Sequence, residues 1–195
     1  MVTATPQRVA LSELHLPIPV SACVWTLKLP RLTTAAATAA SIQRFLPADE
    51  QLLFRGTDLK TRGFFTPVLP AAASAEFGPG LYTTPNLEYA THLAGVGCGV
   101  VYVFRVPEAQ GLRVFEARGK EWDGVVRTAG RRLGWRTDVV VGGVSRDCWE
   151  AKENRRAPKV DERLMQCVWR SGEACRRLAE GCVAVFFIED VQEAV

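Results

Sequence analysis

The stretches of apolar residues in this chain are short, and they follow one another without a regular period. Strand-like runs, such as GVVYVFRVP from Gly99 and CVAVFFIED from Cys182, alternate irregularly with helix-like runs and outnumber the long helical ones. A doubly wound parallel sheet needs strands and helices that alternate at a regular spacing. The pattern therefore predicts an α+β fold, in which a β-sheet forms the core and helices lie beside it.

The composition indicates one folded domain and argues against two classes of partner. Of the 195 residues, 48% are apolar and 23% are charged, as in ordinary globular domains. The net charge of +3 is too small for wrapping a nucleic acid through its phosphates. No run reaches the roughly 18 to 20 apolar residues of a membrane span, and residues 1–20 lack the apolar core of a secretory signal. We expect a cytoplasmic protein with no membrane partner; unconventional secretion stays open.

The six cysteines have no pair at the C-x-x-C spacing of a zinc site. Four of them lie in or beside apolar runs, where a small buried thiol is commoner than a disulfide. We therefore expect no metal site and structural thiols, with disulfides as the less favoured alternative. The cysteines are Cys23, Cys98, Cys148, Cys167, Cys175 and Cys182.

The N-terminal part of the chain differs from the rest. The first thirty residues mix prolines with short apolar runs and show no sustained period, which is typical of an extended arm. Residues 33–46 begin with threonines, are rich in alanine and precede Pro47, all signals of a helix. We therefore predict an N-terminal arm and helix over residues 1–47, and a domain over residues 48–195.

Within that domain, strand-like and helix-like segments follow a long loop. We predict a buried strand at 51–57, a loop to residue 75 that is long enough to cover a site, and a helix at 86–94 capped by Asn86. The charged segment 146–163 is predicted to be a solvated loop with a short helix, or else a substrate-facing loop. Further strands are expected within 78–85, 99–107, 112–115, 137–143, 163–170 and 182–190, and helices within 120–133 and 171–180.

Familiar catalytic motifs are absent: the sequence has no P-loop, no G-x-G-x-x-G opening a helix, no H-E-x-x-H and no G-x-S-x-G. Only two histidines, His15 and His92, are available for acid/base chemistry. What remains is FRGT, ending at Thr57, followed about twenty residues later by EFGPGLYTTPNLEYATHLA. The glycines allow a backbone to approach a flat ligand closely, Tyr82 offers an aromatic face, and Arg55 has a planar fork that suits a diphosphate.

FRGT and GPGLYTTPNLEYA resemble motifs of the ADP-ribosyltransferase superfamily, in particular its diphtheria-toxin and PARP-like branch and small bacterial relatives. That branch has a histidine-glycine-threonine or -serine triplet on the first core strand, then a glycine-x-glycine-x-tyrosine strand and an alanine-containing helix. TDVVVGGVSRD and QCVWRSGEACRRL resemble later segments of the small relatives. The resemblance covers roughly residues 51–188 and is most specific at 78–94. It implies a split antiparallel β-sheet core with flanking helices, NAD as a substrate and no metal.

Carried onto this chain, the resemblance implies a role for each matched residue. Gly56 would offer backbone groups to the nicotinamide amide, Tyr82 would stack on the nicotinamide ring, and Thr57 would neighbour the ribose. The residues that would bind NAD in this way are Arg55, Gly56, Thr57, Gly80, Tyr82 and Thr83.

Two positions depart from the PARP-like pattern. Arg55 stands where the triplet has histidine, and in this it is similar to the cholera-toxin-like branch and the RES toxins. Gln166 falls nearest to the usual glutamate, so the expected catalytic residues are Arg55, Tyr82 and Gln166. Cleavage of the N-glycosidic bond passes through an oxocarbenium-like cation that a carboxylate stabilises, and glutamine carries no charge. Gln166→Glu is therefore expected to raise NAD turnover or leave it intact. The acids that would supply a carboxylate from a folded-over loop are Glu150, Glu153 and Glu162.

Each of the three catalytic candidates also has a purely structural alternative. Arg55 would pair with an acid at the end of its strand, Tyr82 would be an ordinary half-buried strand residue, and Gln166 would face solvent. These alternatives would leave the motifs without a catalytic role.

The sequence thus predicts a mono-ADP-ribosyltransferase, or an NAD glycohydrolase, that breaks the bond between nicotinamide and ribose. The ADP-ribose would pass to water or to a macromolecular acceptor, which we expect to be a protein, with a nucleic acid still open. Two alternatives remain: a non-catalytic module that binds NAD or ADP-ribose, and an interaction domain without a pocket. Whether the chain is a toxin, an effector or a housekeeping enzyme is left open.

Overall fold

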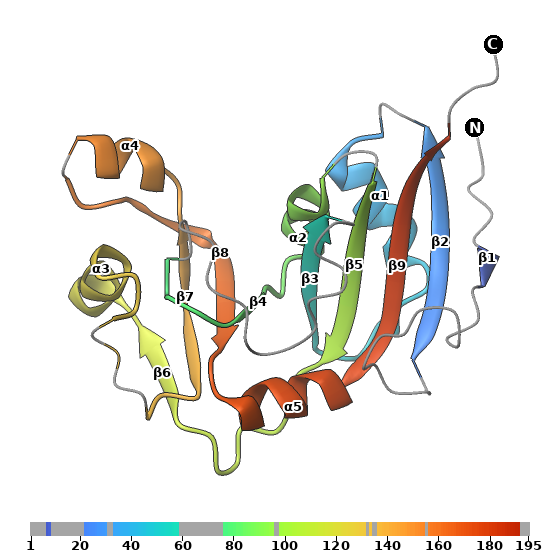
Figure 1. Cartoon of the computed structure of the whole chain (residues 1–195). Coiled ribbons are helices and arrows are strands. Elements are labelled where there is room, and N and C mark those ends of the chain that lie inside the picture. Colours follow the sequence, from blue (N-terminus) through green and yellow to red (C-terminus); the bar gives the residue numbers. More distant parts are fainter. Residues whose placement is uncertain are drawn as a thin grey trace. The chain divides into compact units, whose positions relative to one another are not determined.

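The computed structural model describes residues 7–8, 22–30, 33–58, 76–95, 98–131, 133, 136–154 and 156–191. These residues form an α+β fold with two mixed β-sheets (Figure 1), which confirms the predicted class. The chain divides into two compact units, each with one of the sheets. The described residues of the first unit fall within Met1–Phe65, Thr84–Pro107 and Leu178–Val195, and those of the second within Thr66–Thr83 and Glu108–Arg177.

The sheet of the first unit has the strand order β1-β2-β9-β5-β3. The apolar run from Cys182 is its central strand, as its composition predicts. Antiparallel pairing holds for β1–β2, β5–β9 and β3–β5, but β2 and β9 run parallel. No short hairpin joins these two strands, so nothing forces them to be antiparallel. The strands are β1 (Gln7–Arg8), β2 (Cys23–Pro30), β3 (Leu52–Asp58), β5 (Cys98–Arg105) and β9 (Cys182–Val191).

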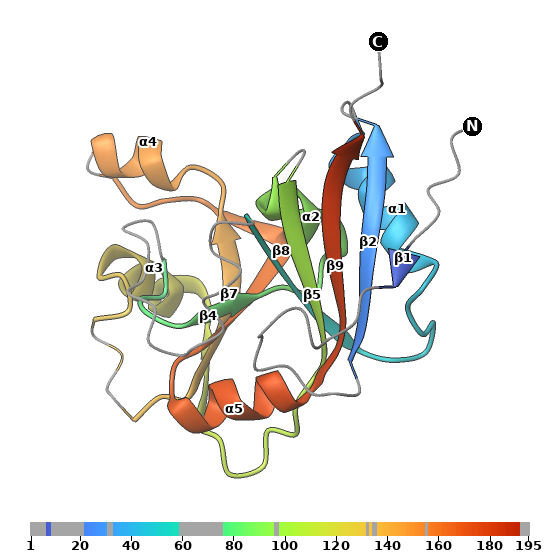
Figure 2. The same ribbon diagram turned by 45° about the vertical axis from the view of Figure 1, so that its right-hand side comes forward.

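Two helices, α1 (Ala35–Gln43) and α2 (Leu87–Ala94), cover one face of this sheet (Figures 1 and 2). α2 begins at its predicted cap, Asn86, and α1 begins at Thr34, the second residue of the predicted helical segment. The Thr34 side chain accepts a hydrogen bond from the N–H of Ala37 (3.2 Å), and Asn86 Oδ1 accepts one from the N–H of Tyr89 (2.8 Å). The core between sheet and helices is apolar and includes Leu27, Ile42, Phe54, Ala90, Val101 and Phe186.

Part of the predicted N-terminal arm belongs to this sheet. Cys23–Pro30 forms β2, and the side chains of Val24 and Leu27 are almost completely buried. The sequence pattern does not reveal this strand because the buried residues change faces along it. Val24 and Thr26 are buried on one face and Leu27 and Leu29 on the other, so no single period of two runs through the strand. The described part of the arm therefore supplies two strands of this sheet, β1 and β2.

The second unit has the strand order β4-β8-β7-β6, and here β6 and β7 run parallel while the other pairs are antiparallel. The sheet packs against helix α3 through Phe77, Trp122, Val125 and Val168. The indole N–H of Trp122 donates to the carbonyl oxygen of Gly143 (2.7 Å). The strands are β4 (Leu81–Thr83), β6 (Val114–Ala117), β7 (Val139–Ser145) and β8 (Val160–Trp169); the helices are α3 (Gly119–Arg127), α4 (Cys148–Glu153) and α5 (Gly172–Glu180), of which α5 continues into the first unit.

A buried carboxylate holds the start of β7 to the residue before β6. Asp138 accepts hydrogen bonds from Arg113 through the backbone N–H (2.9 Å), Nε (3.0 Å) and Nη2 (3.3 Å). The Arg113 side chain is the main cause that lowers the pKa of Asp138 to about 2. A folded-state pKa below the ordinary value stabilises the fold above about pH 4, and this contribution is lost as the pH falls through about 2.

We therefore expect Asp138→Asn to lower the melting temperature by roughly 3 to 10 °C at pH 7, because hydrogen bonds to a charged group contribute about 1.5 to 3 kcal/mol. Melting curves of parent and variant between pH 7 and pH 2 check this. The difference should shrink below about pH 4, and a constant difference down to pH 2 would contradict the assignment.

Candidate functional site

The outer edge of β3 carries the FRGT motif. Phe54 exchanges two backbone hydrogen bonds with Thr84, from N–H of Phe54 (2.7 Å) and from N–H of Thr84 (2.8 Å), on the side of the strand away from β5. Backbone groups two residues apart in a strand point to the same side. The N–H and C=O of Gly56 therefore point out of the sheet edge as well, and no described residue outside the sheet bonds to them.

Gly56 also explains how close α2 lies to this strand. A Cβ atom at residue 56 would lie 1.7 Å from the carbonyl oxygen of Ala90 and 2.9 Å from the backbone nitrogen of Ala94. Any side chain at this position would therefore collide with the main chain of α2. The glycine has a packing role on one side of the strand and presents bare backbone at the edge.

Arg55 and Thr57 project to the other face of the sheet, away from α1 and α2. Arg55 is the register partner of Tyr102, and both residues of such a pair lie on one face. Arg55 and Thr57 are half-buried. Their predicted contacts with NAD stay predictions.

Tyr82, Gly80 and Thr83 lie in or beside β4 of the second unit. The Tyr82 hydroxyl donates to the carbonyl oxygen of Gly78 (2.7 Å) and accepts from the N–H of Phe77 (3.1 Å). Burial is the main cause that raises the pKa of this hydroxyl. The ring packs against the core of the unit and is half-buried. Tyr82 thus fixes the turn before its own strand.

The neighbours of Tyr82 are held tightly by β8. Thr83 is buried, and its hydroxyl accepts a hydrogen bond from the indole N–H of Trp169 (2.9 Å). A Cβ atom at Gly80 would lie 2.6 Å from Cγ1 of Val168, so this position too requires glycine. These contacts fix the backbone of β4 on β8.

Gln166 in β8 is buried, with an exposed fraction of 7%, so the alternative that it faces solvent is wrong. Its side-chain Nε2 donates to Oε2 of Glu76 (2.8 Å). Ser145, at the end of β7, donates its backbone N–H to both carboxylate oxygens of Glu76 (3.2 Å each) and its hydroxyl to Oε1. Three donor groups therefore converge on one carboxylate.

The register places Tyr82 and Gln166 on one face of the second sheet. Tyr82 pairs with Val168, and Gln166 lies two residues before Val168 on the same strand. The partner of Gln166 on β7 is Gly142, where a Cβ atom would meet the ring of Phe77 at 2.6 Å. The structure thus brings two of the three catalytic candidates to one face, while Arg55 belongs to the first unit.

A guanidinium lies beside Tyr82. Burial lowers the pKa of Arg170, whose positive charge interacts with Tyr82. Its Nε and Nη1 atoms are buried and have no hydrogen-bond partner among the described residues. The surroundings of Tyr82 therefore carry a desolvated positive charge.

Three acids were expected to supply the carboxylate that Gln166 lacks. Among the described residues, none of them forms a hydrogen bond with Gln166. Glu150 in α4 forms an ion pair with Arg156 (3.1 Å), Glu153 is exposed, and Glu162 in β8 is exposed. The carboxylate beside Gln166 is that of Glu76, a contact that the sequence patterns do not reveal. The only signal was its place just before the glycine turn, and that place alone does not indicate a partner ninety residues away.

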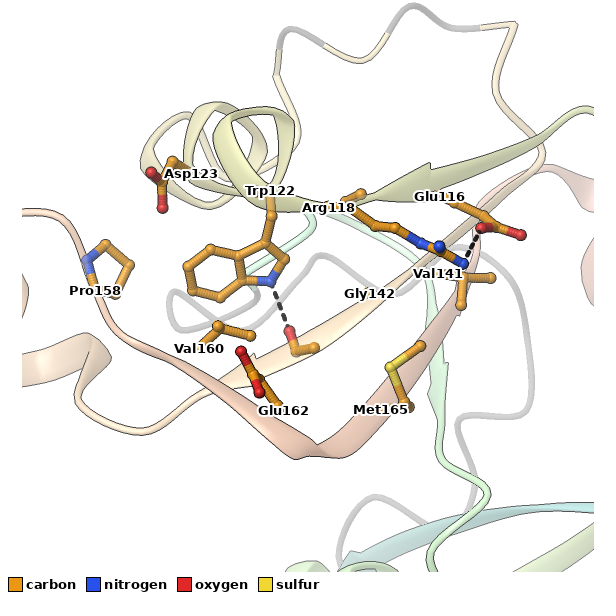
Figure 3. A pocket seen from close by; sticks show the side chains of 13 residues that line it. Glu116, Arg118, Trp122, Asp123, Val141, Gly142, Pro158, Val160, Glu162 and Met165 are labelled. Atoms are coloured by element: carbon orange, nitrogen blue, oxygen red, sulfur yellow. Dashed lines mark hydrogen bonds and ion pairs between the residues drawn. The ribbon is translucent and has the colours of Figure 1, made fainter.

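A pocket of about 630 Å³ lies in the second unit, between the start of α3 and strands β7 and β8 (Figure 3). Figure 3 shows the Trp122 indole with Asp123 and Pro158 on one side and the Glu116–Arg118 ion pair (2.7 Å) on the other. Its walls combine carboxylates with apolar side chains. The lining residues are Glu116, Ala117, Arg118, Gly119, Trp122, Asp123, Val141, Gly142, Gly143, Pro158, Val160, Glu162 and Met165.

In the part of the chain that the structure describes, no group of three or more histidine, cysteine or acidic side chains is arranged to hold a metal ion. The cysteine side chains described, Cys23, Cys167, Cys175 and Cys182, are free thiols. No helix among the described residues is long and apolar enough to span a membrane. Comparison of the chain with models of protein families, with curated proteins and with solved structures found no match.

Proposed function

We propose that this chain binds NAD and cleaves the bond between nicotinamide and ribose, as a mono-ADP-ribosyltransferase or an NAD glycohydrolase with a split-sheet core of the ADP-ribosyltransferase kind. The observation that carries the proposal is the edge of β3 at Gly56. An N–H and a C=O of one residue point outward there, beside a helix that allows no side chain. A carboxamide, which has one acceptor and one donor group, suits that pair.

The motif around Gly56 supports the same ligand independently. FRGT and the glycine-rich strand with Tyr82 resemble the segments that bind nicotinamide in ADP-ribosyltransferases. FRGT lies on β3, and the glycine-rich segment forms β4 and leads into α2, the order of elements that the resemblance implies. Transfer to an acceptor and hydrolysis share the first step, so both activities follow from one site.

The lack of a negative charge at residue 166 favours one alternative function. In this alternative the chain is a module that binds NAD or ADP-ribose without cleaving it. Gln166 carries no carboxylate, and its amide nitrogen already donates to Glu76. A site that holds the ribose hydroxyls without stabilising the ribosyl cation would bind NAD and leave it intact.

Incubation of the protein with NAD tests the proposal. We expect release of nicotinamide, measured by chromatography, and stabilisation of the fold by about 2.7 kcal/mol when NAD is at a hundred times its Kd. An increase in the mass of an acceptor by one ADP-ribose unit would identify a transferase, whereas free ADP-ribose would identify a glycohydrolase. Stabilisation without nicotinamide release would support the binding module. Neither effect at millimolar NAD would refute both functions.

A further inference from the structure

The carboxylate of Glu76 is held in place by groups that have no other evident task. It accepts hydrogen bonds from Nε2 of Gln166 (2.8 Å), from the backbone N–H of Ser145 (3.2 Å to each oxygen) and from the Ser145 hydroxyl. These partners come from β8 and from the end of β7, so two strands fix one acid. These hydrogen bonds hold Glu76 firmly. Because its side chain is only half-buried, it still reaches the surface of the unit.

The proposed reaction needs a negative charge near the sugar. In NAD the bond between C1′ of the ribose and the pyridinium nitrogen breaks, and its electron pair stays on that nitrogen. Neutral nicotinamide leaves, and the positive charge passes to the ribosyl group as an oxocarbenium-like cation. A fixed carboxylate stabilises that cation more than it stabilises bound NAD, and this difference accelerates the reaction.

We propose that Glu76 supplies this carboxylate and is a catalytic residue of the chain, with Gln166 and Ser145 as the residues that position it. The inference rests on the proposed function. Gln166 would then keep the position of the family glutamate on the strand, while the charge comes from an acid in direct contact with it. After the cation forms, the acceptor hydroxyl or a water attacks C1′, a C–O bond forms, and the proton of the nucleophile passes to solvent.

Other acids are poorer candidates on the geometry. Glu150 is already paired with Arg156, and Glu153 and Glu162 are exposed. Only Glu76 among the acids named here contacts Gln166 in the described part of the chain. It also lies close enough to Tyr82 for its charge to act on the phenol. The carboxylate, Gln166 and Tyr82 therefore belong to one cluster.

The contact also removes the reason to expect a gain from Gln166→Glu. A glutamate at residue 166 would face the Glu76 carboxylate at hydrogen-bond distance, and two carboxylates at that distance cannot both ionise freely. The pair should share one proton near pH 7 and keep one negative charge, so the single variant should not exceed the parent kcat. Exchanging the two residues is different, because the double variant Glu76→Gln, Gln166→Glu keeps one amide and one carboxylate in contact.

The test compares nicotinamide release by the parent, Glu76→Gln, Gln166→Glu and the double variant, with a melting curve for each. We expect Glu76→Gln to lower kcat by about 100- to 1000-fold with little change in KM, which is the usual effect of losing a charge contact made in the transition state. The double variant should regain at least tenfold over Glu76→Gln. Glu121→Gln, which removes an exposed acid of the same unit, is the matched control and should keep the parent rate.

The outcomes distinguish a failure of the proposed function from a failure of the role of Glu76. A parent protein that releases no nicotinamide refutes the proposed function and this inference with it. An active parent whose Glu76→Gln variant stays within threefold overturns only the role of Glu76. A lower melting temperature with unchanged kcat assigns Glu76 to structure alone. Loss of activity without rescue in the double variant also overturns the charge role.

Discussion

Replacing Gly56 with alanine is expected to lower the melting temperature by about 6 °C or more, or to prevent folding. The new Cβ would lie 1.7 Å from the carbonyl oxygen of Ala90. Because the obstructing atoms belong to the main chain of α2, no rotamer change relieves the clash, and α2 must shift away from β3. Overpacking of this kind costs about 3 kcal/mol or more, which corresponds to roughly 6 to 12 °C in a protein of this size.

Gly124 in α3 provides the matched control, because a Cβ there would meet nothing within 4 Å. Gly124→Ala should stabilise the fold by about 0.5 to 1 kcal/mol, the usual gain for alanine over glycine inside a helix. Melting curves of the two variants and the parent test whether α2 packs against β3 at Gly56. If Gly56→Ala melts like the parent, α2 does not pack on β3 as described.

Tyr82→Ala is expected to weaken NAD binding by about one to two orders of magnitude. An aromatic contact with the nicotinamide ring contributes roughly 0.5 to 1.5 kcal/mol beyond its buried area, and the lost area adds about 25 cal/mol per Å². At about 1.4 kcal/mol per tenfold change in Kd, these losses give the expected range. Calorimetric titration of NAD into the folded variant measures it.

Tyr82→Phe separates the ring from the hydroxyl. The phenylalanine keeps the aromatic face but removes the hydrogen bonds to Phe77 and Gly78. We therefore expect a lower melting temperature with almost parental NAD affinity. Equal NAD affinity in Tyr82→Ala and the parent, with only stability reduced, would remove β4 from the nicotinamide site.

The features that the sequence predicted well depend on neighbouring residues. The caps Thr34 and Asn86 mark the starts of α1 and α2 because a capping side chain bonds to a backbone N–H three residues on. The composition of the run from Cys182 likewise predicts a strand buried on both faces. Such signals lie within one segment of sequence and need no knowledge of the rest of the fold.

The features that it missed depend on distant partners. β2 is a strand because β9 pairs with it, and nothing near Cys23–Pro30 reveals that partner. Glu76 is part of the candidate site through Ser145 and Gln166, which follow 69 and 90 residues later. Single-sequence patterns carry no information about such pairings, so neither the sheet order nor the carboxylate could be predicted from them.

The parallel pairing of β2 with β9 also affects the protein during its synthesis. The partner of Cys23 is Ala184, and a ribosome adding about 5 to 20 residues per second needs roughly 10 to 30 s to reach it. Throughout that interval β2 lacks β9, and among the described strands only the two residues of β1 can pair with it. Most of its apolar residues are therefore exposed to other unfolded chains. Chaperone dependence and slow, non-local folding are therefore expected of this protein.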